Sequence, residues 1–99
     1  MTQIVTRRTT AQQEAYKRDG GFCVWCYQKR DIRIYATDVH HILGRKPGAD
    51  IPEACISLCP HCHRDEAHNA GHPNKAELIE LMKEVYGIDL WAILPEYAS

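Results

Sequence analysis

The sequence predicts a small α+β domain, and three observations support this fold class. The chain has 99 residues, a length typical of one domain with a modest hydrophobic core. Two short segments, 32–35 and 39–43, have the composition of strands, whereas residues 75–86 have the apolar spacing of an amphipathic helix. Two Cys-x-x-Cys pairs flank the predicted strands, and they are Cys23 with Cys26 and Cys59 with Cys62. We therefore expect residues 1–99 to form one domain, with its core at about residues 20–70.

The N-terminal part of the chain predicts one helix. The segment Thr10-Ala-Gln-Gln13 fits a capping box, in which the threonine and glutamine side chains satisfy free backbone amides. The helix is expected to run to about Arg18, and Asp19-Gly20-Gly21 ends it because glycine accepts the left-handed conformation. Residues 1–8 show no periodicity, so we expect an extended or mobile arm there.

The first Cys-x-x-Cys pair lies in the apolar segment 22–27, which predicts a compact turn with both sulfurs directed to one point. With the second pair, four thiolates suit the tetrahedral coordination of a structural zinc ion. Zinc is favoured over disulfides because residues 1–18 are polar and do not resemble a signal peptide, so the expected location is the reducing cytoplasm. No apolar run is long enough to span a membrane. The fifth cysteine, Cys55, is expected to be a small buried apolar residue.

The middle of the chain predicts a β-hairpin followed by a loop and a helix. Strands at 32–35 and 39–43 are expected to pair around the weak turn at 36–38. The Gly- and Pro-rich segment 44–48 predicts a loop. Residues 49–56 then predict a short helix, because an aspartate and a proline stand at its expected start.

The last part of the chain predicts two helices and an apolar end. A short helix is expected at about residues 62–69. The longer helix 75–86 is expected to begin at the capping signal Asn74-Lys-Ala-Glu77 and to end at Gly87. The apolar segment 88–94 either packs back on the core or forms a dimer contact, so the oligomeric state stays open.

Charge is balanced overall but uneven along the chain. The sequence has 12 Lys and Arg against 13 Asp and Glu, a formal net charge of −1, which argues mildly against bulk nucleic-acid binding. Basic residues gather in the first half and acidic residues in the second. This pattern predicts either a basic face opposite an acidic one or ordinary solvated charge. Arg45 and Lys46, in a Gly/Pro loop, either contact phosphates or are solvated loop charges.

Three histidines form a second group of interest. His40 and His41 are adjacent on a predicted strand, and His63 directly follows a cysteine of the second pair. Imidazole changes protonation near neutral pH and is a common metal ligand, so the group suits proton transfer and metal binding. The simpler alternative is three unrelated surface or structural histidines. Adjacent strand residues point to opposite faces, so His40 and His41 share a site only where the strand bends or ends, or from different sides of an ion. Asp38 is either a hydrogen-bond acceptor for one imidazole or a turn residue.

The combined pattern resembles the HNH endonuclease family, the ββα-metal nucleases. The resemblance extends from Cys23 to about His68 and rests on Cys23-x-x-Cys26, Asp38-Val39-His40-His41-Ile42 and Leu58-Cys59-x-x-Cys62-His63. It implies a β-hairpin and a helix that hold one divalent cation (Mg²⁺, Mn²⁺, Ni²⁺ or Zn²⁺), flanked here by N-terminal and C-terminal helices. It also implies that His41 is the general base and that His40 and His63 coordinate the catalytic ion. The expected substrate is DNA, cut to leave a 5′-phosphate.

Three positions qualify this resemblance. The family usually has an asparagine five residues before the third cysteine, where it braces the loop of the base histidine, and this chain has Ala54 there. His68 is a candidate third ligand, although it lies five residues after His63, about 140° around an ideal helix. Arg45 is a candidate for stabilising the transition state. The alternative function is a non-catalytic zinc module that binds DNA or a partner protein in a phage packaging or restriction complex.

Overall fold

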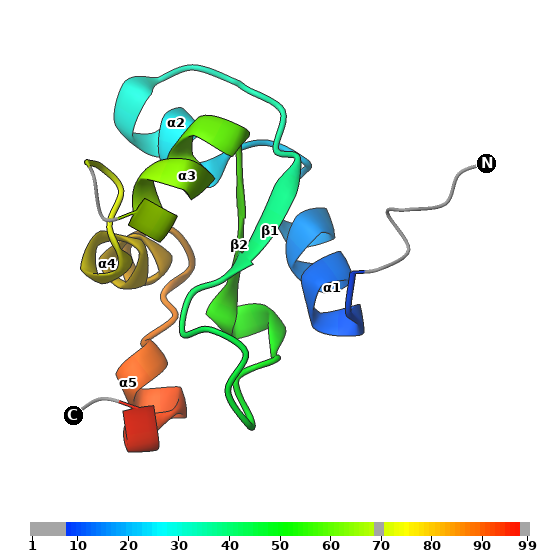
Figure 1. Cartoon of the computed structure of the whole chain (residues 1–99), viewed down its shortest axis with the longest axis vertical. Coiled ribbons are helices and arrows are strands. Elements are labelled where there is room, and N and C mark those ends of the chain that lie inside the picture. The colour runs from blue at the N-terminus through cyan, green and yellow to red at the C-terminus, as the bar shows by residue number, and fades with distance from the viewer. Residues whose placement is uncertain (1–7, 69–70, 98–99) are drawn as a thin grey trace.

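The computed structural model describes residues 8–68 and 71–97, apart from the side chains of residues 67 and 68. The arm predicted at residues 1–8 lies outside this part of the chain, except for its last residue. A two-stranded antiparallel sheet lies at the centre of the molecule, with helices on either side of it (Figure 1). The predicted α+β class is confirmed.

The sheet pairs β1 (Asp38–His41), which corresponds to the strand predicted at 39–43, with β2 (Cys55–Leu58), so the partner strand differs from the predicted one. The prediction of a strand at 32–35 is wrong, because this segment is exposed and forms no strand. The prediction of a helix at 49–56 is also wrong, since only Pro52–Ala54 forms a 3-10 turn. All residues of β2 are buried. A strand covered on both faces has no alternation of polar and apolar residues by which a sequence could reveal it.

The two faces of β1 have different neighbours. Val39 packs against two alanines of helix α1 (Thr10–Arg18). Because side chains alternate along a strand, His41 points to this same face. His40 points to the opposite face, which is covered by helix α3 (Pro60–His68) (Figure 1). The two adjacent histidines therefore lie on opposite faces of the strand.

The capping box of α1 is shifted by one residue from its prediction. Thr9 rather than Thr10 is the cap: its hydroxyl accepts from the amide of Gln12 at 3.1 Å, and Gln12 Oε1 accepts from the amide of Thr9 at 2.9 Å. Gln12 is also buried, and its Nε2 donates to the carbonyl of Val39 at 2.7 Å. The inward position of this glutamine, which a local sequence pattern does not show, fixes α1 against β1.

Helix α2 (Val24–Arg30) occupies the segment predicted to be a compact turn. Cys23 is its N-cap residue, and Cys26 lies in its first turn. The helix ends at Asp31, which has a left-handed backbone conformation with φ of 55°. The Cys-x-x-Cys pair therefore marks a helix start, and this geometry still brings both sulfurs to the same end of the helix.

Helix α4 (Lys75–Tyr86) confirms the predicted amphipathic helix. Asn74 and Glu77 form the predicted capping box, and Gly87 ends the helix with φ of 69°. These predictions are accurate because caps depend on residues that are close in sequence. Neither α4 nor any other helix in the described part of the chain is long and apolar enough to cross a membrane.

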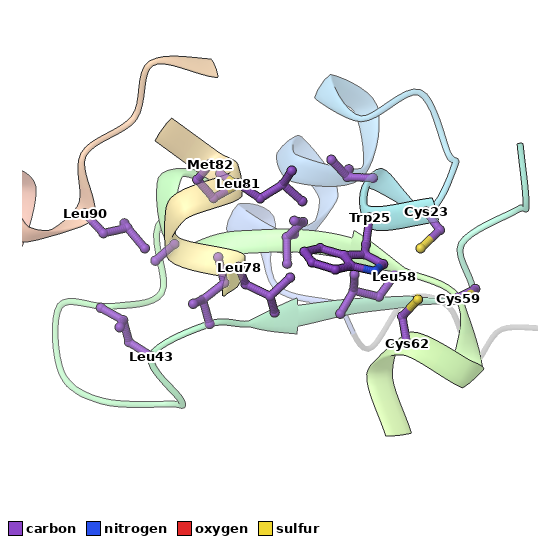
Figure 2. Packing of buried hydrophobic residues seen from close by; sticks show 14 of the residues in the cluster. Cys23, Trp25, Leu43, Leu58, Cys59, Cys62, Leu78, Leu81, Met82 and Leu90 are labelled. Carbon is purple, nitrogen blue, oxygen red and sulfur yellow. The ribbon is translucent and has the colours of Figure 1, made fainter. Parts of the chain in front are cut away.

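The hydrophobic core lies between the sheet and α4 (Figure 2). The buried residues that α4 contributes are Leu78, Leu81 and Met82. Helix α5 (Leu90–Ile93) packs on the same core through Leu90, which is fully buried. The apolar end of the chain therefore packs back on the core, as the first of the two alternatives predicted.

Candidate active site

Four cysteines meet where the start of α2 lies against the start of α3. The side chains are those of Cys23, Cys26, Cys59 and Cys62. Figure 2 labels three of them, Cys23, Cys59 and Cys62. Their sulfurs all lie within 4.8 Å of one another, with 3.9 Å between Cys26 and Cys59 and 3.6 Å between Cys26 and Cys62. Tetrahedral zinc with Zn–S bonds of about 2.3 Å places its sulfurs about 3.8 Å apart. The cluster therefore has the donors and the spacing of a structural zinc site.

The four thiols are buried and influence one another. A hydrogen bond from the thiol of Cys62 lowers the pKa of Cys23 to about 5. Burial and the charge on Cys23 raise the pKa of Cys26 to about 11. Without a cation, the cluster therefore holds only part of the negative charge that four thiolates would carry. A zinc ion would compensate this charge, so the chemistry of the donor set also fits the metal.

On the α3 face of β1, His40 and His63 lie side by side, with ring centroids 5.0 Å apart. Nδ1 of His63 is 3.0 Å from Oδ2 of Asp38, which accepts a hydrogen bond from it. This contact gives Asp38 the predicted role of acceptor for one imidazole. It also directs the proton of a neutral His63 to Nδ1, so that Nε2 keeps its lone pair for a metal ion.

The surroundings of His40 also suit metal binding. Burial lowers the pKa of His40 in spite of the nearby carboxylate of Glu66, so the imidazole is kept neutral. Its Nε2 is completely buried and has no hydrogen-bond partner among the described residues. A buried polar atom without a partner is costly. Such an orphaned nitrogen fits a position that an ion normally fills.

On the α1 face, His41 is 7% exposed and is held by an acidic side chain. Its Nε2 is 2.8 Å from Oδ1 of Asp50, and the same oxygen accepts a hydrogen bond from the Thr9 hydroxyl at 2.8 Å. The hydrogen bond from His41, followed by the one from Thr9, lowers the pKa of Asp50, so its carboxyl stays ionised near neutral pH. Asp50 is itself half exposed, and it fixes the ring of His41 from the solvent side.

A cavity of about 290 Å³ joins the two faces near the end of β1. Its lining residues are Gln12, Val39, His40, His41, Gly44, Arg45 and His63. The geometric problem posed by two adjacent strand histidines is thus resolved, because both reach one cavity from opposite sides of β1. A hollow of about 330 Å³ beside Phe22 and Tyr86 is slightly larger, but it contains none of these histidines. The histidine cavity is therefore the better candidate for a reaction site.

The other predicted site residues have different outcomes. Arg45 lines the histidine cavity, where a cation can meet a bound phosphate. His68 belongs to α3, but its side chain lies outside the described residues. Two residues were missed in the sequence: Glu66, whose Oε1 is 2.9 Å from Nε2 of His40, and Asp50. Glu66 lies three residues after His63, a spacing that places both on one helix face and could have revealed it.

Residues 23–69 match the model of the HNH endonuclease family. These residues form a domain of that family. The chain is also 30% identical over 86 residues to the "Type IV methyl-directed restriction enzyme EcoKMcrA" of Escherichia coli (strain K12), and this match covers 71% of the chain. The chain spans 30% of the length of that relative. No solved structure matches the chain.

In this HNH domain, the position of the usual asparagine is occupied by the fully buried Ala54. Its carbonyl accepts a hydrogen bond from the amide of Ile42 at 2.9 Å, directly after His41. The amide side chain of Gln12 holds the other side of the strand at Val39. Backbone and side-chain contacts thus brace β1 around His41 without the asparagine.

Proposed function

We propose that this HNH domain is a metal-dependent endonuclease that hydrolyses phosphodiester bonds in DNA. The observation that carries this proposal is the single cavity shared by His40, His41 and His63. It combines two imidazole nitrogen donors on one side with a potential proton acceptor on the other. The family match and the relative named a restriction enzyme support DNA as the substrate.

His40 and His63 would hold the divalent cation. Their Nε2 atoms are the candidate metal-binding atoms, since Asp38 occupies Nδ1 of His63 and Nε2 of His40 makes no hydrogen bond within the described chain. When bound, a divalent cation supplies positive charge that stabilises the phosphate and the leaving oxygen. The cavity that all three histidines line could place a phosphate between the ion ligands and His41.

His41 would act as the general base. With Asp50 ionised and accepting from Nε2, the unprotonated nitrogen of neutral His41 is Nδ1. This nitrogen takes a proton from water as the water oxygen forms a bond to phosphorus. The bond from phosphorus to the 3′ oxygen breaks, which leaves a 5′-phosphate and a 3′-hydroxyl once that oxygen is protonated. Arg45 would neutralise a phosphate at the cavity edge.

The test is plasmid cleavage by zinc-loaded protein with added Mg²⁺, Mn²⁺, Ni²⁺ or Zn²⁺. We expect supercoiled DNA to become nicked or linear with at least one ion, and cleavage to stop when that second ion is chelated. A second candidate function, a non-catalytic zinc module that binds DNA or a partner protein, is favoured by Ala54 and by the net charge of −1. Retarded migration of DNA in gels without cleavage by any ion would support the module and refute the nuclease.

Asp50 provides a further prediction for the same reaction. Asp50→Asn keeps the size of the side chain but weakens its hold on Nε2 of His41, so we expect the rate of cleavage, kcat, to fall about tenfold with little change in KM. Asp31→Asn is the matched control, because Asp31 is exposed at the end of α2, away from the histidines. Equal rates for the Asp50→Asn variant and the parent would show that Asp50 does not position the base.

A further inference from the structure

We propose that Glu66 is a third protein ligand of the divalent ion held by His40 and His63. This inference rests on the metal site of the proposed function and adds a carboxylate to it. Glu66 lies on α3 three residues after His63, so both side chains leave the same face of the helix, toward β1. Only 11% of the Glu66 side chain is exposed, although glutamate is usually found in contact with water.

The distance between Glu66 and His40 is that of two ligands on one ion. Oε1 of Glu66 is 2.9 Å from Nε2 of His40, yet this nitrogen makes no hydrogen bond of acceptable geometry. Metal–nitrogen and metal–oxygen bonds of about 2.1 Å at right angles place the two ligand atoms about 3.0 Å apart. The pair therefore has the spacing of neighbouring metal ligands without the geometry of a hydrogen bond.

Both partners of this contact are largely withdrawn from solvent, since 16% of the His40 side chain and 11% of the Glu66 side chain are exposed. A buried carboxylate needs a compensating positive charge or hydrogen bonds. A cation between Nε2 of His40 and the carboxylate of Glu66 would supply that charge.

His63 completes the ligand set from the exposed side. The three ligand atoms do not all lie within 4.8 Å of one another, as those of the cysteine cluster do. The side chain of His63 is 37% exposed and is held only at Nδ1 by Asp38. The ring of His63 has its centroid 5.0 Å from that of His40, so it would have to turn toward the ion for Nε2 to become a ligand.

The proposed ligand set predicts which ions bind. Two imidazoles and one carboxylate carry a single negative charge. The carboxylate oxygen would allow the site to bind hard cations such as Mn²⁺ and Mg²⁺. A site with histidine in place of Glu66 would retain Ni²⁺ and Zn²⁺, which bind imidazole well, and would lose Mn²⁺.

The test measures Mn²⁺ and Ni²⁺ binding to the full, zinc-loaded chain by calorimetry, together with the rise in melting temperature that each ion causes. We expect Glu66→Gln to weaken Mn²⁺ binding at least about tenfold and Glu66→His to restore Ni²⁺ but not Mn²⁺ binding. Asp65→Asn is the matched control, because Asp65 is the adjacent residue on α3 and contacts His61 instead. Zinc content and circular dichroism check that each variant is folded.

Two further variants separate this inference from the proposed function. If His40→Ala and His63→Ala lose Mn²⁺ binding while Glu66→Gln and Glu66→His bind it as tightly as the parent, Glu66 is not a ligand and the two-histidine site remains. If the parent binds no second ion, the metal site of the proposed function is wrong and the role of Glu66 fails with it. A loss of stability in Glu66→Gln that is equal with and without Mn²⁺ would assign Glu66 a structural role only, and would also overturn the inference.

Discussion

His41→Ala should reduce DNA cleavage by about 10²–10⁴-fold, because a positioned general base contributes rate enhancements of that size. The zinc site and the fold should remain, since His41 contacts Asp50 and does not belong to the cysteine cluster. The measurement is the first-order rate of plasmid nicking under the ion that gives the fastest cleavage by the parent. Binding of DNA should change little, because the imidazole acts mainly on the attacking water.

His61→Ala is the matched control for this prediction. His61 lies on α3, is 57% exposed and contacts Asp65 rather than the cavity. The His61→Ala variant should therefore cleave DNA at the rate of the parent. A His41→Ala variant that is folded, binds zinc and also cleaves at that rate would show that another group activates the water.

Cys62→Ser should unfold the domain. The change removes one of four thiolates from the buried cluster between α2 and α3. Structural zinc contributes about 10–16 kcal/mol to folding in small zinc peptides, whereas the net stability of a domain is about 5–15 kcal/mol. Loss of most of the free energy of zinc binding would therefore exceed the net stability that the rest of the small domain provides. Far-UV circular dichroism and zinc analysis should show loss of helix together with loss of metal.

Cys55→Ala is the matched control for the zinc prediction. Cys55 is also fully buried, and burial raises the pKa of its thiol to about 12, so it stays protonated as an apolar side chain. It lies in β2, against α1, and outside the four-cysteine cluster. This variant should keep one zinc ion per chain. A folded Cys62→Ser variant that retains its zinc would refute the four-cysteine site.

The sequence was most informative where a feature depends on neighbouring residues. The cysteine cluster follows from two Cys-x-x-Cys pairs, and the cap at Asn74 and the stop at Gly87 follow from local backbone preferences. Strand pairing is different, because β2 lies 13 residues beyond β1 and is buried on both faces. The exposed segment 32–35 had the better local pattern of a strand but no partner in the sheet.

The site shows the same division between local and tertiary information. The three histidines could be identified from residue type and spacing. Their shared cavity could not, because it forms only where β1 ends in the folded chain. Asp50 and Glu66 were missed because their roles arise from contacts across the fold, to His41 and His40. Only the helical spacing of Glu66 from His63 offered a local sign of its position.

Helix α3 directly follows Cys59, contains Cys62 and continues with His63 and Glu66. In the proposed enzyme, the two metal sites would therefore be thermodynamically linked through one rigid element. Chains without zinc would not present His63 and Glu66 to β1, so the apparent affinity for the second ion would fall in proportion to the fraction of chains that hold zinc. Zinc supply or oxidation of the thiols would then set how much of the protein is competent to cut, without any change in the reaction centre itself.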